Sequence, residues 1–267
     1  MRCYGLSREG TCGWQNDPIF HRARINGRLG LYFCENTPKL GGMNEAMPHT
    51  HTADIALKCK RWLECIALFV GLPVVFYFFP LIGVLFVALW ALVLLCFAVL
   101  KFSMRRNLKD YYRLKLMSRE NLVPVLARFL VCAIALAALT FFYVPDKLLF
   151  LPQELPKLWL LIMVFYPMLS AWPQEFIFRI FFFERYQDIF PTKHSMILAS
   201  GIAFGLAHIM FNNWVAISLT LIGGVMFSYT FHKTRSFWLV WFEHAIYGCF
   251  LFTIGLGHFF YTGNIQP

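Results

Sequence analysis

Five side chains that can donate, accept or transfer protons lie inside apolar stretches of this chain. Gln174, Glu175 and Arg179 stand in the run Gln-Glu-Phe-Ile-Phe-Arg, and His208 and His244 each occupy a separate apolar run. Polar groups at membrane depth cost free energy, so they usually face a bundle interior or a water-filled cavity and mark a functional site. Two imidazoles and a carboxylate could activate a water molecule and stabilise an oxyanion during amide hydrolysis.

The same groups have simpler structural interpretations. Glu175 and Arg179 are four residues apart, so on a helix they share a face and can form an ion pair that only ties helices together. A single imidazole at His208 or His244 can serve as a hydrogen-bond partner for a neighbouring helix. The combination of the pair with two histidines on other helices favours a functional site.

A metal site is a further interpretation of these residues. His208, His244 and Glu175 could hold a divalent metal such as zinc and leave one coordination position open for water. The motif His-Glu-x-x-His, the usual signature of zinc proteases, does not occur in the sequence. The sequence therefore leaves a metal-dependent and a metal-free site as alternatives.

The composition is that of a membrane protein. Hydrophobic residues make up 59% of the 267 residues and charged residues 14%, whereas a soluble domain is about 45–50% apolar and about 25% charged. We predict an all-α fold, a polytopic membrane helix bundle of about eight transmembrane helices within residues 61–267. The predicted helical segments are 63–79, 81–100, 122–144, 158–172, 174–190, 196–211, 214–231 and 237–261.

Residues 1–60 differ in composition from the rest of the chain. They are polar, hold many of the glycines and lack clear periodicity. We interpret them as a polar N-terminal extension, either disordered or weakly folded. An alternative hypothesis is a mis-assigned start, with translation beginning at Met43 or Met47, near the change in composition.

The formal net charge of +10 is concentrated beside the apolar runs. No separate polar domain carries the basic residues, which argues against nucleic-acid binding. The segment 101–119 is especially basic, and the positive-inside rule predicts that it is a cytoplasmic loop in contact with the lipid bilayer. The basic residues before the first span predict a cytoplasmic N-terminus in the same way.

Three short motifs resemble those of the CPBP family of intramembrane proteases, the CAAX protease and bacteriocin-processing (Abi) family. The family's motifs are Glu-Glu-x-x-x-Arg, Phe-x-x-x-His and His-x-x-x-Asn or Asp. The chain offers, in the same order, Gln174-Glu175-Phe-Ile-Phe-Arg179, Phe204-Gly-Leu-Ala-His208 and His244-Ala-Ile-Tyr-Gly248. The resemblance covers roughly residues 158–261, and the helix count extends it to about residue 60.

The resemblance implies an intramembrane endopeptidase that hydrolyses a peptide bond in a membrane-anchored or lipidated protein or peptide. It places His208 and His244 in the catalytic cavity and has Arg179 brace the carboxylate of Glu175. Gln174 stands where the family has its water-activating Glu, and Gly248 stands where it has Asn or Asp.

These two departures define the roles that we expect. Glu175 or a histidine replaces the missing Glu as the base, and His208 is the histidine that orients or activates water. His244 binds the oxyanion, and Gln174 positions the scissile amide. The alternatives are a catalytically inactive pseudoprotease that binds a membrane peptide, and a polytopic transporter or scaffold. Prenylated CAAX tails are one substrate class of the family, and the sequence does not choose among the classes.

Overall fold

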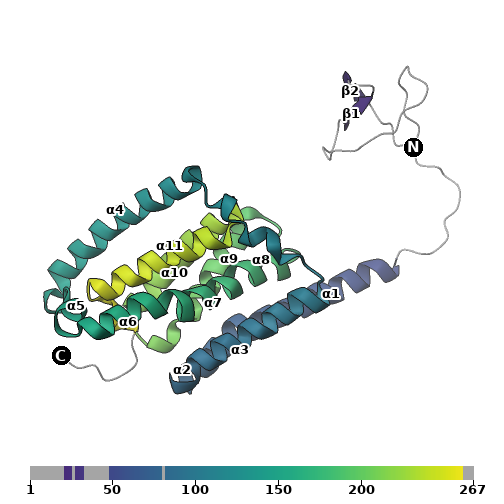
Figure 1. Cartoon of the computed structure of the whole chain (residues 1–267). Helices are drawn as coiled ribbons and strands as arrows, with labels where there is room; N and C mark the ends of the chain where they lie inside the picture. The colour runs from purple at the N-terminus through teal and green to yellow at the C-terminus, as the bar shows by residue number, and fades with distance from the viewer. Residues whose placement is uncertain (1–20, 26–27, 33–47, 80–81, 261–267) are drawn as a thin grey trace, which may run out of the picture. The chain divides into compact units, whose positions relative to one another are not determined.

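A computed structural model describes residues 21–25, 28–32, 48–79 and 82–260 of the chain (Figure 1). The contacts divide the chain into two compact units, Met1–His51 and Thr52–Pro267.

In the first unit, strand β1 (His21–Ile25) pairs antiparallel with strand β2 (Arg28–Tyr32). Met43 and Met47, the two alternative starts, lie outside the described residues. The interpretation of residues 1–60 as a polar extension stays a prediction.

The second unit, as far as it is described, is built from helices alone, which confirms the predicted all-α bundle. The helices are α1 (Pro48–Ile66), α2 (Leu72–Phe78), α3 (Leu85–Ala98), α4 (Arg119–Tyr143), α5 (Phe150–Glu154), α6 (Pro156–Tyr166), α7 (Trp172–Glu175), α8 (Phe182–Arg185), α9 (Lys193–Leu206), α10 (Trp214–Thr234) and α11 (Phe237–Thr253). Four π-helical segments continue them: η1 (Ala67–Gly71), η3 (Val99–Ser103), η7 (Pro167–Ala171) and η8 (Phe176–Phe181). Six 3₁₀ turns complete the unit: η2 (Ile82–Val84), η4 (Leu108–Tyr112), η5 (Leu114–Leu116), η6 (Pro145–Lys147), η9 (Ile209–Phe211) and η10 (Leu256–Phe260).

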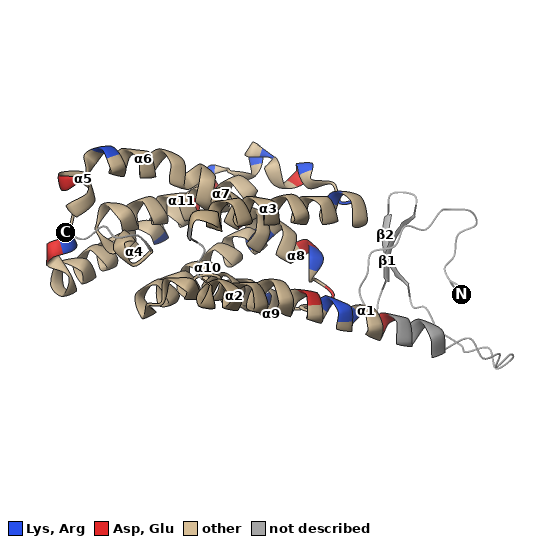
Figure 2. Cartoon of the chain, turned by 90° about the horizontal axis from the view of Figure 1, so that it is seen from below, with Lys and Arg blue, Asp and Glu red and all other residues tan. Residues whose placement is uncertain are grey.

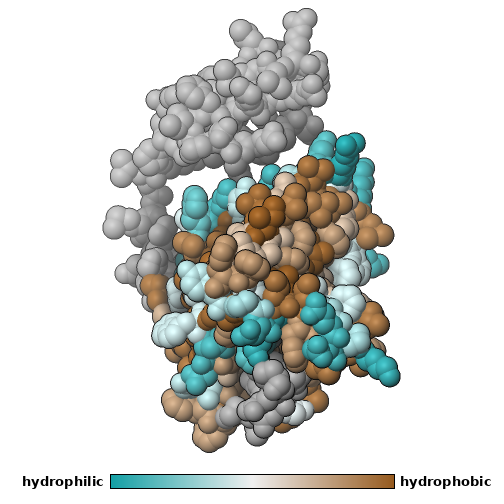
Figure 3. Space-filling model, turned by 90° about the vertical axis from the view of Figure 1, so that its left-hand side faces the viewer, coloured by the Kyte–Doolittle hydropathy of each residue, from teal (hydrophilic) through white to brown (hydrophobic). Residues whose placement is uncertain are grey.

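Six helices are long and apolar enough to cross a membrane, and α11 is a shorter apolar helix. The six are Asp54–Phe78, Leu85–Ser103, Arg119–Tyr143, Pro156–Arg185, Lys193–Phe211 and Trp214–Thr234. Large apolar side chains on these helices are exposed, among them Val131 and Phe142 on α4, and apolar residues cover much of the face in Figure 3. Such a surface suits lipid, so the protein is a multi-pass membrane protein.

The structure differs from the sequence prediction at Pro173. The two helices predicted at 158–172 and 174–190 form one continuous span, Pro156–Arg185. A proline inside a helix removes a backbone donor and clashes with the preceding turn. Pro173 lies between the π-helical segments η7 and η8, whose wider turns accommodate such irregularities without ending the helix.

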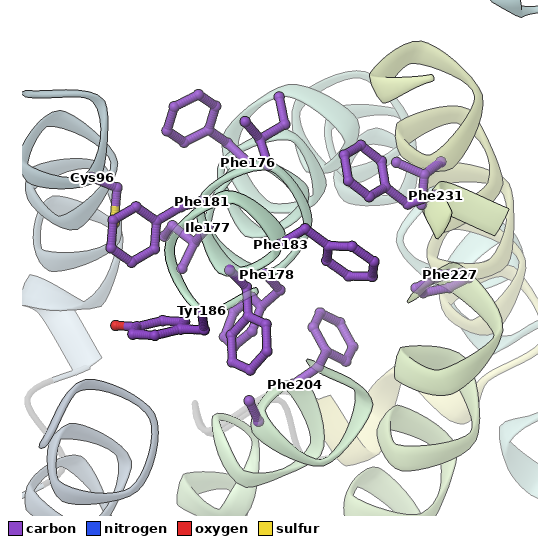
Figure 4. Close-up of a cluster of buried hydrophobic side chains, with 14 of the residues drawn as sticks. Cys96, Phe176, Ile177, Phe178, Phe181, Phe183, Tyr186, Phe204, Phe227 and Phe231 are labelled. Atoms are coloured by element: carbon purple, nitrogen blue, oxygen red, sulfur yellow. The ribbon is translucent and has the colours of Figure 1, made fainter. Parts of the chain in front are cut away.

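The core of the bundle forms around η8. All six residues of η8 are buried, and their aromatic side chains meet rings from α9 and α10 (Figure 4). The Phe178 and Phe204 rings lie edge to face, with their centroids 5.3 Å apart. The Phe227 ring is the third member of the cluster, with its centroid 6.1 Å from that of Phe204. This aromatic cluster fixes η8 against α9 and α10.

Helices α9 and α10 approach each other through glycines. A Cβ atom at Gly201 would lie 2.8 Å from the backbone nitrogen of Val225, and one at Gly224 would lie 2.7 Å from the carbonyl oxygen of Gly201. Small residues at such crossings let backbones pack closely inside a membrane. The close contact sets the position of the C-terminal end of α9, where His208 lies.

Charged residues lie mostly near the ends of the helices (Figure 2). At one end, Arg106 Nε lies 2.8 Å from Glu184 Oε2, and Arg185 Nε donates to Glu64 Oε1 over 2.7 Å. The first contact ties the basic 104–118 loop to α8, and the second ties α8 to the first span.

Candidate active site

The structure brings Glu175, Arg179 and His244 together. Arg179 Nε lies 3.1 Å from Glu175 Oε2, and both side chains are fully buried. His244 Nδ1 lies 2.8 Å from Glu175 Oε1. Because a carboxylate only accepts hydrogen bonds, the hydrogen lies on Nδ1. Glu175 therefore links the Pro156–Arg185 span to α11.

Arg179 is held by more than its carboxylate. Its Nη1 donates to Ser200 Oγ over 3.0 Å and to the carbonyl oxygen of Phe178 over 3.2 Å. Its guanidinium carbon lies 5.2 Å from the centre of the Phe204 ring, within the range of a cation–π contact. These contacts compensate part of the cost of burying the charge and fix Arg179 beside Glu175.

His208 lies just after the end of α9, at the other side of Phe204. Its Nδ1 is 2.7 Å from the carbonyl oxygen of Phe204, so Nδ1 carries the hydrogen. In the neutral ring, Nε2 then has a free lone pair that can accept a proton. His208 is half-buried and lines a cavity that could hold a bound molecule.

A cavity of about 1300 Å³ reaches these residues. Gln174, His208 and His244 line it, while Glu175 and Arg179 are not among its lining residues and lie behind the wall. The remaining wall is mostly apolar and comes from helices on all sides of the bundle. Its volume exceeds the roughly 300–1,000 Å³ of typical small-molecule pockets, so a peptide segment or a lipid chain fits it better.

Gln174 is tied to its own helix at the cavity wall. Its Nε2 donates to Ser170 Oγ over 2.8 Å. Its Oε1 is buried and has no hydrogen-bond partner among the described residues. An unpaired buried acceptor costs about 1–3 kcal/mol, a cost that a donor from a bound peptide or water would remove.

Sequence reasoning missed Tyr166, the last residue of α6. Its Oη lies 3.0 Å from His244 Nε2, and the side chain lines the cavity beside Gly248. A Cβ atom at position 248 would lie 2.2 Å from Tyr166 Oη. No local signal marks Tyr166, because a single tyrosine in an apolar run is common in membrane helices.

A second charge pair, with a buried carboxylate and a half-buried guanidinium, lies apart from these residues. Arg128 of α4 donates through Nε to Glu243 Oε1 over 3.1 Å and through Nη2 to Thr230 Oγ1 over 2.7 Å. Glu243 precedes His244, but adjacent helical residues point about 100° apart, so the two side chains serve different neighbours.

The residues present do not fit a metal. Both ring nitrogens of His244 are engaged, Nδ1 by Glu175 and Nε2 by Tyr166. His208 Nδ1 is engaged by a backbone carbonyl, which leaves one free imidazole nitrogen. Within the described part of the chain, no three His, Cys, Asp or Glu side chains cluster in a way that could hold a metal ion.

Comparison with known proteins identifies the family. No curated protein and no solved structure matches the chain. Residues 156–250 match the family described as type II CAAX prenyl endopeptidase Rce1-like. This stretch runs from the start of α6 into α11 and contains the five predicted site residues. Residues 156–250 are therefore an Rce1-like type II CAAX prenyl endopeptidase domain, of a family of intramembrane endopeptidases in the CPBP group.

Proposed function

We propose that the protein is an intramembrane endopeptidase that hydrolyses a peptide bond in a prenylated or otherwise membrane-anchored protein. One observation carries this proposal: Gln174, His208 and His244 line one cavity that is large and apolar enough for a lipidated peptide. The family points to prenylated proteins as the substrate class. Several helices that line the cavity are long and apolar enough to cross a membrane, which supports access for such a lipid anchor.

His208 is the general base in this proposal. Its free Nε2 takes a proton from the attacking water, a step that typically contributes about 10²–10⁴-fold to the rate. Glu175, the other candidate base, has no exposed surface and is occupied by Arg179 and His244. We therefore assign Glu175 and Arg179 to positioning His244.

Gln174 and His244 contact the substrate from parts of the cavity wall other than the one that His208 forms. The unpaired Oε1 of Gln174 accepts a hydrogen bond from a substrate amide or from water. Hydrogen-bond donors on the His244 side of the cavity stabilise the negative charge that develops on the scissile carbonyl oxygen.

The test is cleavage of farnesylated CAAX peptides by the purified full-length protein in detergent, with products identified by mass spectrometry. His208→Ala should lower kcat by at least about 100-fold, because the base is lost. His194→Ala, which removes an exposed histidine outside the cavity, should leave kcat unchanged. No cleavage by the wild type, or equal cleavage by His208→Ala, contradicts the proposal.

A catalytically inactive, peptide-binding protein is a second candidate. The observation that favours it is Gln174, an amide at the position where the family has a carboxylate base. It predicts that farnesylated peptides bind without turnover, and that Gln174→Glu creates turnover. If the wild type cleaves and Gln174→Glu does not increase the rate, this candidate is wrong.

A further inference from the structure

A chain of polar contacts runs from the sealed interior to the cavity and ends at Tyr166. Arg179 contacts Glu175, Glu175 accepts from His244 Nδ1, and His244 Nε2 lies 3.0 Å from Tyr166 Oη. The first two residues are fully buried, whereas Tyr166 is half-buried and lines the cavity. The buried charges therefore influence a bound molecule through the hydroxyl of Tyr166.

We infer that Tyr166 is a further catalytic residue, whose hydroxyl donates a hydrogen bond to the scissile carbonyl oxygen of the bound peptide. This inference rests on the proposed function. It adds a group from α6 to His208, which follows α9, and His244 of α11, and it assigns to Tyr166 the contact that the sequence alone assigned to His244.

Gly248 provides the independent support. It lies four residues after His244, so both face the same side of α11. A Cβ atom there would lie 2.2 Å from both Oη and Cε1 of Tyr166, which is closer than any real contact. The tyrosine hydroxyl thus occupies the space into which a side chain at position 248 would extend. Glycine at that position, a departure from the Asn or Asp of the family motif, makes room for it.

The ring of Tyr166 is held on two sides. It packs edge to face against Phe252, with centroids 5.5 Å apart, and against His244, with centroids 6.0 Å apart. A donor fixed in this way needs little reorganisation when charge develops on the substrate, which is what oxyanion stabilisation requires.

The hydroxyl hydrogen of Tyr166 is available to the substrate in the state in which His244 Nε2 also carries a hydrogen. Nδ1 carries a hydrogen that Glu175 accepts, so a proton on Nε2 makes the ring cationic beside a carboxylate. In that form Nε2–H donates to Tyr166 Oη, and the tyrosine hydrogen is free for the carbonyl oxygen. No proton leaves the protein in this step, because the oxyanion is stabilised by a hydrogen bond alone.

The first experiment compares Tyr166→Phe with Tyr186→Phe in the detergent assay. Tyr186 is also buried and bonds a carboxylate, with Oη 3.2 Å from Glu64 Oε1, but it does not line the cavity. Removal of one oxyanion donor costs about 10²–10³-fold in kcat. We expect that loss in Tyr166→Phe with KM nearly unchanged, and wild-type kcat in Tyr186→Phe.

A second readout needs no turnover. A farnesylated CAAX peptide with a phosphonate in place of the scissile bond presents an anionic oxygen at the carbonyl position. Its Kd should rise at least about 10-fold in Tyr166→Phe, while the Kd of the unmodified peptide stays the same. Equal phosphonate affinity in wild type and Tyr166→Phe overturns the role of Tyr166, whether or not the protein is active.

The third experiment moves the hydrogen-bond donor from position 166 on α6 to position 248 on α11. Tyr166→Ala empties the space over Gly248, and Gly248→Asn in the same chain supplies an amide donor there. The double variant should be at least about 10-fold more active, or bind the phosphonate that much more tightly, than Tyr166→Ala. Absence of product in the wild type, together with weakened phosphonate binding in Tyr166→Phe, contradicts the endopeptidase function but supports the donor.

Discussion

At the scale of single residues, burial explains which groups do chemistry and which only support it. Glu175 and Arg179 have no exposed surface, so their charges are stabilised by each other and by surrounding dipoles and rings. Taking two charges out of water is costly, and removing one partner leaves the other uncompensated. His208 and Tyr166 keep access to the cavity and can touch a substrate.

Glu175→Gln should therefore act first on stability. The neutral amide leaves the buried guanidinium of Arg179 without its counter-charge, which typically costs about 3–5 kcal/mol. We expect a lower midpoint of thermal unfolding in detergent and loss of peptide cleavage. Glu120→Gln, at an exposed site in the first turn of α4, is the control and should unfold like the wild type. An unchanged midpoint for Glu175→Gln would contradict the buried ion pair.

At the scale of elements, the site depends on how closely helices can approach. Helices α9 and α10 meet at Gly201 and Gly224. At both positions the other helix lies so close that a methyl group would not fit. His208 follows the end of α9, and Phe227 of α10 stacks on His244. The contact between α9 and α10 therefore positions both histidines. Packing between two helices therefore sets the separation of the two histidines.

Neighbouring glycines of α10 test this packing. Gly224→Ala should separate the helices, cost about 1–3 kcal/mol through overpacking, and lower activity. Gly223→Ala meets only the Phe227 ring, at 3.4 Å, and should be neutral or stabilising by up to about 1 kcal/mol through helix propensity. Thermal unfolding and cleavage measured on both variants give the answer. Equal behaviour of the two would show that α9 and α10 do not need this close contact.

Among the described residues, Arg128 attaches helix α4 to the bundle through polar contacts. Most of its surface is exposed, and Arg128 bonds the buried Glu243 of α11. Arg128→Met should destabilise the protein because Glu243 is left buried without its partner. The double variant Arg128→Met/Glu243→Gln should be less destabilised than the sum of the single variants, with a coupling of about 0.5–3 kcal/mol. Additive shifts in unfolding would rule out the attachment.

At the scale of the whole membrane unit, the basic 104–118 loop and part of the cavity wall lie toward opposite ends of the helices. Contacts between Arg106 and Glu184 and between Arg185 and Glu64 define a basic end. Cavity-lining residues such as Lys147 and His258 come from the connections at the other end. The positive-inside rule predicts that the basic end is cytoplasmic, so the part of the cavity wall formed by Lys147 and His258 is expected toward the opposite face of the membrane.

Cysteine labelling tests this orientation. In a background without native cysteines, Leu114→Cys and Leu149→Cys place exposed thiols in the connections at the two ends. A membrane-impermeant maleimide added to intact cells should label Leu149→Cys, and Leu114→Cys only after permeabilisation. The reverse pattern would place the basic end outside the cytoplasm. Equal labelling of both in permeabilised cells serves as the control for accessibility.

The sequence by itself determined the membrane class, the helical fold and the order of the motif residues. These depend on local quantities: the hydropathy of about 20 consecutive residues and the four-residue spacing that puts Glu175 and Arg179 on one face. Pro173 misled the prediction of a helix end, because π-helical turns on both sides absorb it.

Only the tertiary structure decided which groups share a cavity and which are sealed behind it. Glu175 is hidden and His208 is accessible because of how α9 and α11 pack on η8, which no local pattern encodes. Tyr166 and His244 are 78 residues apart in the chain, and their contact exists because Gly248 leaves space for a ring from another helix. The residue at the cavity end of the polar chain is therefore set by packing between helices, which the sequence of either helix does not reveal.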